Sequence, residues 1–387
     1  MQFIMRKIVW TLLALLPLVS AHAQETPGWI RKNAVSPDGK TLAFSYKGDI
    51  WTVPVSGGTA RQITSHRAYE SDPLWTPDGR SIVFSSYREG GKDLYITAAE
   101  GGQPRRLTDM PGNETPLAVD KDGNIYYTWY HADFQSPGFD GFPGQPALYR
   151  TTTEGAAPQL VTSLTIGALS INGKGEMLYE DWKGYEDPLR KHHTSSVTRD
   201  IWLYRPSVPG CIDAKGSFRQ LSTYEGEDRN PVFAADGDSF YFLSERDGKT
   251  SNIYRSSLSR PSEQVQLTFY DKNPVRFLSV AGDGTVAYSY NGELYTLEGG
   301  KVDIRLYRDE DENEMSPMNL KNASDIAVSP GGKEIALVMR GDVFVTSADY
   351  ATTRRITNTA AQERGVCFSE DGRELYYASE RNVCWSI

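Results

Sequence analysis

Local catalytic signatures are absent from this 387-residue chain. It contains no G-x-S-x-G, no H-E-x-x-H, no G-x-x-x-x-G-K-[ST] and no C-x-x-C. A self-contained enzyme of this length needs some such constellation, although its members can lie far apart in sequence. The absence therefore disfavours an enzyme that is complete within this chain.

An excess of basic residues is also missing. The chain has 41 Lys and Arg against 50 Asp and Glu, which gives a net charge of −9. An acidic surface repels nucleic acid and offers no electrostatic footprint for it. We expect no nucleic-acid partner.

Long apolar runs are lacking except at the N-terminus, and even that run is short. Arg6 and Lys7 give a basic start, residues 8–19 are apolar, and Ala21-His22-Ala23 has the small-x-small pattern of a cleavage site. The run is too short to span a bilayer stably. We predict a signal peptide over 1–23, export to the periplasm if the source is a Gram-negative bacterium, and no membrane span after cleavage. An uncleaved anchor is the alternative.

One turn sequence recurs eight times along the chain, and the same kind of segment follows each copy. The turns are SPDG at 36, TPDG at 76, DKDG at 120, NGKG at 172, AADG at 234, AGDG at 281, SPGG at 329 and SEDG at 369. A short tag follows each: DIW at 49, DLY at 93, ALY at 147, DIW at 200, NIY at 252, ELY at 293, DVF at 342 and NVC at 382. Six copies then have a closing phrase: RQIT at 61, RRLT at 105, QLVT at 159, RQLS at 219, VQLT at 265 and RRIT at 354.

This repeat predicts an all-β fold. A period of about 40–60 residues that holds four short strands, here called a to d, is typical of a β-propeller blade. Six copies predict a six-bladed propeller of four-stranded antiparallel blades over 24–307. The acidic run after Tyr307 predicts a linker over 308–322, and 323–387 then begin a second, incomplete propeller of about two blades. A single eight-bladed ring, closed by pairing of residues 30–33 with 382–387, is the alternative.

The end of the sequence leads us to expect a truncated blade. The last copy stops at Ile387, after strand c and before any strand d. A blade without its outer strand leaves an open edge, which natural proteins avoid.

The three cysteines form an odd set for an exported chain. Cys367 and Cys384 fall on the first and third strands of one repeat, roughly 9–10 Å apart. This separation is beyond disulfide reach. Cys211 lies in a predicted loop, so we expect all three to be unpaired.

Length variation gathers on one side of the predicted disc. Because antiparallel strands alternate direction, the b–c and d–a connections share one face, and the long b–c segments 130–146 and 183–199 come from neighbouring blades. Insertions on one face of a repeat protein usually mark the working face.

The basic segment within 183–199 is the first candidate binding site. It contains Arg190, Lys191, His192 and His193. Adjacent residues on an extended chain point in opposite directions, which makes the two histidines poor joint metal ligands. A basic clamp for a substrate carboxylate and a contact to another domain remain open, beside a plain surface loop.

The aromatic segment within 130–146 is the second candidate. Phe134, Phe139 and Phe142 can stack on a peptide or on a neighbouring domain, or they can pack the loop from within. The acidic tags match no calcium loop. We therefore predict no metal, no cofactor and no catalytic residue in this chain.

The repeats resemble TolB-like propeller repeats, which are shared by TolB, prolyl-oligopeptidase-type enzymes and tricorn-type peptidases. The order of signal peptide, six repeats, acidic linker and a new series is similar to the start of a bacterial tricorn-type serine peptidase. The new series reads RGDVFVTSADYATTRRITNT at 340–359 and FSEDGRELYYASERN at 368–382. The resemblance implies a six-bladed and then a seven-bladed propeller, a PDZ-like domain and a C-terminal serine-peptidase region, so every catalytic residue of that family would lie outside this chain.

The resemblance implies a non-catalytic propeller that gates, channels or docks peptides for a downstream peptidase. The alternative is a stand-alone, TolB-like periplasmic binding propeller, and an enzyme complete in itself is the third reading. The expected partners are peptides or downstream domains of the same polypeptide, with homo-oligomerisation left open.

Overall fold

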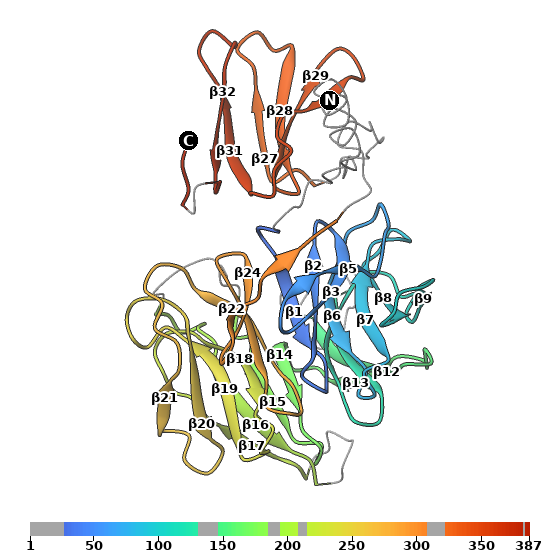
Figure 1. The fold of residues 1–387 in the computed structure, drawn as a ribbon, viewed down its shortest axis with the longest axis vertical. Coiled ribbons are helices and arrows are strands. Elements are labelled where there is room, and N and C mark those ends of the chain that lie inside the picture. Colours follow the sequence, from blue (N-terminus) through green and yellow to red (C-terminus); the bar gives the residue numbers. More distant parts are fainter. Residues whose placement is uncertain (1–26, 131–145, 185–193, 208–214, 308–321, 382–383) are drawn as a thin grey trace, which may run out of the picture.

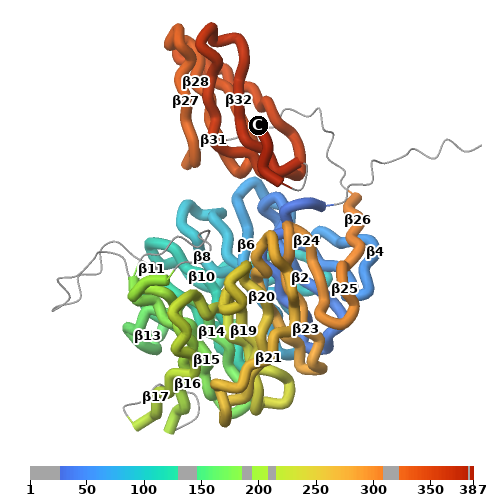
Figure 2. Tube along the Cα trace, turned by 90° about the vertical axis from the view of Figure 1, so that its left-hand side faces the viewer, coloured from blue at the N-terminus to red at the C-terminus, as the bar shows by residue number. Residues whose placement is uncertain are grey.

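The computed structural model describes residues 27–130, 146–184, 194–207, 215–307, 322–381 and 384–387 (Figure 1). These residues form strands and turns without a helix, so the predicted all-β propeller fold is confirmed. None of the described residues forms a helix that could cross a membrane. The described chain divides into a ring, residues 31–306, and a second unit, residues 322–387 (Figures 1 and 2).

The ring is built from consecutive four-stranded antiparallel sheets, each formed by one continuous segment. The strands of the first three sheets are β1 (Arg31–Val35), β2 (Thr41–Tyr46), β3 (Asp49–Pro54) and β5 (Arg61–Gln62); β6 (Glu70–Trp75), β7 (Ser81–Ser86), β8 (Asp93–Ala98) and β9 (Arg105–Arg106); β10 (Asn113–Val119), β11 (Asn124–Tyr130), β12 (Ala147–Thr152) and β13 (Gln159–Thr162). The next three are β14 (Ile166–Ile171), β15 (Met177–Asp181), β16 (Ile201–Arg205) and β17 (Ser217–Gln220); β18 (Asp228–Phe233), β19 (Ser239–Ser244), β20 (Asn252–Ser257) and β21 (Gln264–Gln266); β22 (Val275–Val280), β23 (Val286–Tyr290), β24 (Glu293–Thr296) and β25 (Gly300–Lys301). The first strands contact one another in cyclic order, β1, β6, β10, β14, β18, β22 and back to β1.

The recurring turn makes the a–b connection as its sequence predicts. Ser36 Oγ donates to Asp38 Oδ1 at 2.7 Å and accepts from the Thr41 amide at 2.9 Å. Gly39 has φ +72°, a conformation that glycine adopts without steric cost. The turn therefore fixes the register between strands a and b.

The tag and the closing phrase are two halves of one hydrogen-bonded unit between strands c and d. The Thr64 hydroxyl accepts from the Ile50 amide at 2.9 Å, and the Gln62 amide side chain donates to Asp49 at 3.1 Å. The hydroxyl contact recurs at Thr108, Ser222, Thr268 and Thr357. The carboxylate of the tag thus accepts a hydrogen bond from the closing phrase. This role is structural.

Hydrophobic side chains fill the seams between sheets. Ala43 and Ile50 of the first sheet pack against Ile82, Phe84 and Tyr95 of the second. Similar clusters lie between the other neighbours. Burial of strand b on both faces therefore depends on a sheet at either side.

The ring closes with a strand pair that the sequence analysis did not predict. We expected the sixth blade to end on its own strand d, with no exchanged segment. After β25, however, β26 (Ile304–Arg305) runs parallel to β4 (Gly58–Thr59), at the outer side of the first sheet (Figure 2). Leu306 is fully buried there, in the cluster that joins the last sheet to the first. The atypical ending of the sixth repeat is thus the closure of the ring.

The second unit repeats the blade pattern with fewer neighbours. It has one four-stranded sheet, β27 (Asp325–Val328), β28 (Glu334–Met339), β29 (Asp342–Ser347) and β30 (Thr353–Arg355), and a two-stranded sheet, β31 (Glu363–Phe368) and β32 (Leu375–Ser379). Ser386 bridges Ser379, so a third strand is started. Cys367 and Cys384 are free, as expected, and Cys211 lies outside the described residues.

The pairing required by the eight-bladed alternative does not occur among the described residues. β1 pairs with β2, Ile30 donates its amide to the Gly292 carbonyl at 2.7 Å, and Ser386 pairs within the second unit. The division of the whole chain at 1–23, 24–307, 308–322 and 323–387 stays a prediction.

Candidate functional site

The predicted site residues lie outside the described part of the chain. This applies to Arg190, Lys191, His192 and His193 and to Phe134, Phe139 and Phe142. The strands that carry these loops are described, however. The loops leave the b–c ends of two sheets whose first strands, β10 and β14, are in contact.

Buried charges fix the base of the basic loop. Arg199 lies 3.6 Å from Glu180 and 3.4 Å from Glu227, and its guanidinium stacks over Trp182 at 5.0 Å. Lys183 pairs with Asp200 at 2.5 Å. Burial raises the pKa of Glu227, although Arg199 acts to lower it. These contacts hold both ends of the loop at the seam with the next sheet.

Several of the innermost strands, β1, β6, β18 and β22, contain a β-bulge. In each of them one residue at the bulge has a left-handed backbone conformation. Lys32, Asp72, Asn230 and Phe277 have φ between +42° and +58°. Register shifts occur at the same place in each strand. Bulges of this kind re-aim the neighbouring side chains.

Arginine precedes the bulge residue in three successive sheets around the ring closure. We call Arg31, Arg229 and Arg276 the arginine cluster. Burial lowers the pKa of Arg276, and the Arg229 and Arg31 guanidiniums lower it further. In the described part of the chain, no carboxylate lies within ion-pair distance of Arg31 or Arg276. The cluster is therefore a region of incompletely balanced positive charge beside the inner strands.

The second charged group on the inner strands is balanced. Asp72 is buried and pairs with Lys32 at 3.2 Å and with Lys92 at 3.0 Å. Burial acts to raise the pKa of Asp72, but the two lysines hold it well below its ordinary value. Lys92 also reaches Thr115 of the next sheet at 3.0 Å. These contacts join three sheets and are structural.

A buried carboxyl pair lies at the seam between the second and third sheets. Glu114 and Asp93 are both fully buried, and Thr108 donates to Glu114 at 3.0 Å. Burial raises the pKa of Glu114 to about 8, and the Asp93 carboxylate adds to this. Acids at the slot of Glu114 in other sheets have an arginine, as in Arg88 with Glu70 at 2.7 Å. Among the described residues Glu114 has no such arginine partner, and its raised pKa favours the protonated form near neutral pH.

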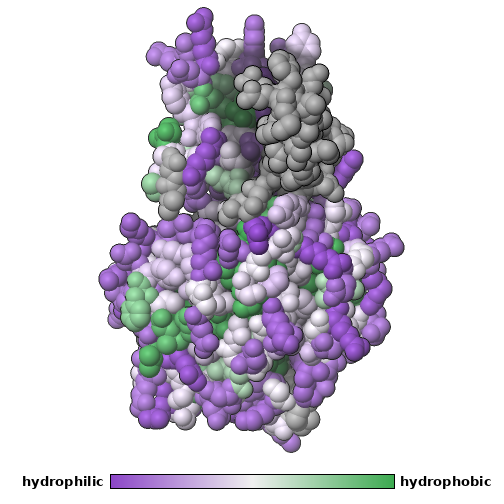
Figure 3. All heavy atoms as spheres, viewed as in Figure 1, coloured by the Kyte–Doolittle hydropathy of each residue, from purple (hydrophilic) through white to green (hydrophobic). Residues whose placement is uncertain are grey.

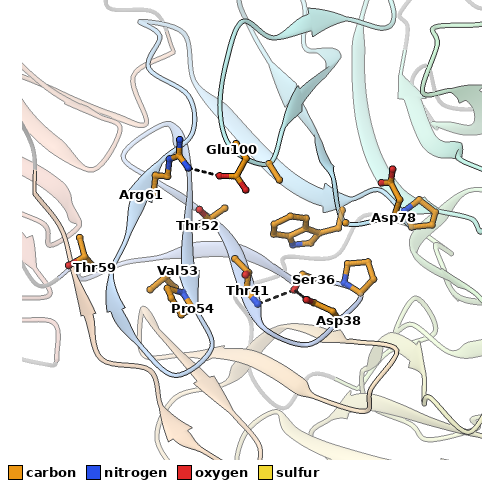
Figure 4. A pocket seen from close by; sticks show the side chains of 15 residues that line it. Ser36, Asp38, Thr41, Thr52, Val53, Pro54, Thr59, Arg61, Asp78 and Glu100 are labelled. Atoms are coloured by element: carbon orange, nitrogen blue, oxygen red, sulfur yellow. Dashed lines mark hydrogen bonds and ion pairs between the residues drawn. The ribbon is translucent and has the colours of Figure 1, made fainter.

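The opposite face of the ring, with the a–b and c–d turns, has a shallow groove between the first two sheets (Figure 4). Its volume is about 580 Å³. Arg61 and Glu100 bridge it at 2.7 Å, and Trp75 donates its indole N–H to the Ala34 carbonyl at 3.0 Å. These residues join neighbouring blades. The hydroxyl and carboxylate that the groove brings together, Ser36 and Asp38, belong to the a–b turn, where they hold its hydrogen bonds.

The arginine cluster was missed by sequence reasoning, although a signal existed. Arg31, Arg229, Arg276 and Arg364 occupy one slot of the repeat, just before the bulge residue. An alignment of the repeats on strand a would have shown it. The described residues contain no group of three His, Cys, Asp or Glu side chains able to hold a metal ion. That the chain binds no metal stays a prediction.

Comparison with known proteins gives one consistent result. The pattern of the tricorn protease N-terminal beta propeller domain matches residues 27–302. Tricorn protease homolog 1 of Streptomyces coelicolor is 27% identical over 286 residues, 70% of this chain and 24% of the relative. Tricorn protease of Thermoplasma volcanium is 25% identical over 327 residues, 80% of this chain and 29% of the relative. The chain thus spans about a quarter of the length of these curated relatives.

A solved structure agrees in fold. The crystal structure of the tricorn protease aligns over 91% of this chain and 33% of that chain, with a TM-score of 0.56 and 19% identity.

Proposed function

Because the chain belongs to the family of tricorn protease N-terminal beta propeller domains, we propose that it is the non-catalytic N-terminal propeller of an exported, tricorn-like peptidase. Its role is to gate, channel or dock peptides for a downstream serine-peptidase region. The family match over residues 27–302 carries this proposal. The absence of local catalytic signatures from the sequence is consistent with it.

The face with the b–c connections is the surface that receives peptides in this proposal. Both long loops start from it. Guanidinium groups bind carboxylates by charge-assisted hydrogen bonds, and aromatic side chains stack on peptides. Residues 130–146 and 183–199 are thus proposed to act together.

Peptide binding to the purified chain tests this role. We expect a fluorescent peptide with a free C-terminal carboxylate to bind, and its amidated form to bind about tenfold more weakly, because a charge-assisted hydrogen bond is lost. The double variant R190A/K191A should weaken binding of the free acid. Arg260→Ala is the matched control, since Arg260 is exposed beside Glu263 at a c–d turn on the opposite face. Equal affinity of the parent and both variants, or no binding of either peptide, would reject the role.

Activity and export are tested separately. The purified chain should not turn over fluorogenic tri- or tetrapeptides, because the proposed nucleophile belongs to a downstream region. Turnover that survives purification and is abolished by a serine-directed inhibitor would contradict this. Export predicts that the mature protein begins at Gln24, which N-terminal sequencing of the periplasmic fraction measures.

A further inference from the structure

The ring and the second unit meet through their b–c faces, at the Arg340 contact with Lys47 and Tyr69. Two-residue hairpins connect β2 to β3 at Lys47-Gly48 and β23 to β24 at Asn291-Gly292. The hairpin of the second unit, Arg340-Gly341, has the same form. In each case both residues have positive φ, from +49° to +88°, as in a type I′ turn. The second unit therefore sits beside the short hairpins of the first and last sheets (Figures 1 and 2).

Arg340 makes the most specific contact between the two parts. Its Nη2 donates to the Lys47 carbonyl at 2.6 Å, and its guanidinium lies over the Tyr69 ring at 5.6 Å. A Cβ atom at Gly48 would lie 2.1 Å from the same nitrogen, so glycine leaves the space that the guanidinium occupies. A charge-assisted hydrogen bond to a carbonyl combined with a cation–π contact orients the unit.

A second contact joins backbone segments. A Cβ atom placed on Gly28 would lie 3.8 Å from the Ala360 Cβ, which is ordinary van der Waals distance. Ala360 lies in the connection between β30 and β31, again on the b–c and d–a side of the second unit. The second unit is therefore held to the ring at two places, on two different connections.

Glu380 provides the electrostatic part of the joint. It lies in the segment that follows β32 and interacts with Arg31 and Arg276 of the ring and with Arg364 of its own unit. Burial, Arg229 and Arg31 act to lower the pKa of Arg276, and Glu245 and Glu380 act to raise it. The arginine cluster, which has too few acids of its own, thus faces an acid from the second unit.

We propose that the second unit is a docked partner of the ring, held on the Lys47–Tyr69 surface by Arg340. This proposal does not depend on the proposed function. It assigns the surface around Gly28, Lys47 and Tyr69 to residues 322–381 of the same chain. The covalent connection through 308–321 alone would require no specific contact.

A disulfide trap tests docking in the full chain. With Cys211, Cys367 and Cys384 changed to Ser, the pair G28C/A360C has the Cβ separation that a disulfide needs. The control pair is G28C with Y350C, because Tyr350 is 74% exposed in the turn between β29 and β30, at the other end of the sheet. We expect oxidation of the docking pair to be at least about tenfold faster at pH 6. Equal rates for the two pairs would overturn the proposal.

Two further variants assign the contacts. Arg340→Ala should slow the docking pair about tenfold, whereas Arg354→Ala, an exposed arginine of the same unit, should not. Amide protection of β28, measured in the same samples, shows whether the second unit stays folded. If disulfide formation slows only in samples that have lost this protection, Arg340 has no role in docking.

Discussion

The valine that precedes the recurring turn is buried in the ring and exposed to solvent in the second unit. Val35 and Val328 both precede the recurring turn, yet Val35 is 7% exposed and Val328 is 59% exposed. Apolar atoms also show on the surface of the second unit in Figure 3. In the ring, each sheet is covered by neighbours on both faces. Local sequence builds the sheet in both regions, and burial comes from the number of neighbours.

The difference extends to strand b. Leu42 and Ile335 are equivalent, but Leu42 is fully buried against residues of the last sheet, and Ile335 is only partly buried. The free energy of hydrophobic burial scales with apolar area removed from water. The ring should therefore be the more stable region.

Replacing these two residues by alanine tests whether the ring is more tightly packed than the second unit. Leu42→Ala is expected to lower the free energy of unfolding of the ring by about 3 kcal/mol, because it removes apolar area and leaves a cavity. Ile335→Ala should cost the second unit less than about 1 kcal/mol, because part of its side chain is already in water. Urea unfolding measures the first, and amide exchange of β28 the second. Equal costs would show that the second unit is as well packed as the ring.

A pH titration should separate the two regions by their buried acids. In the second unit Glu363 has Arg381 at 3.3 Å, whereas no described arginine lies within ion-pair distance of Glu114 in the ring. The pKa of Glu114 is raised to about 8, above its unfolded value, so its proton stabilises the ring at low pH and this contribution is lost as the pH rises. We expect the ring to lose about 2 kcal/mol between pH 6 and pH 8.

The isosteric variant Glu114→Gln is the control for this titration. It keeps the neutral form and should abolish that part of the pH dependence. A parent protein whose urea midpoint is the same at pH 6 and pH 8 would contradict the assignment of a held proton to Glu114.

The smallest effect is expected at the predicted loops. Replacing Arg190 and Lys191 by Ala should change stability by less than about 0.5 kcal/mol, because substitutions in exposed loops rarely cost more. The melting temperature and the peptide affinity are measured on the same samples. A large loss of stability with unchanged peptide affinity would show that Arg190 and Lys191 have a structural role and do not bind peptide.

Much of the fold could be predicted from the sequence because the repeat records local hydrogen bonds. The Ser36-Asp38-Gly39 turn and the pairing of Asp49 with the closing phrase are made between residues close in the chain. Ring closure was not predicted. Ile304 pairs with Gly58, although most of the ring's sequence lies between them, and no local sequence pattern specifies this pairing.

The candidate site was less predictable for a related reason. The arginine cluster arises because bulges in separate strands bring Arg31, Arg229 and Arg276 together, and each arginine alone looks like an ordinary surface residue. The long loops were found by length alone, and their site residues remain predictions.

Hydrogen exchange of strand b in the two regions measures whether protection follows the number of neighbouring sheets. β2 and β28 occupy the same place in their sheets, so one mass-spectrometric experiment on the intact chain compares them under identical conditions. We expect amides of β2 to exchange about a hundredfold more slowly than those of β28, because local opening is easier where a sheet face is exposed. Equal protection of β2 and β28 would show that the second unit is protected without neighbours on both faces, and would contradict this expectation.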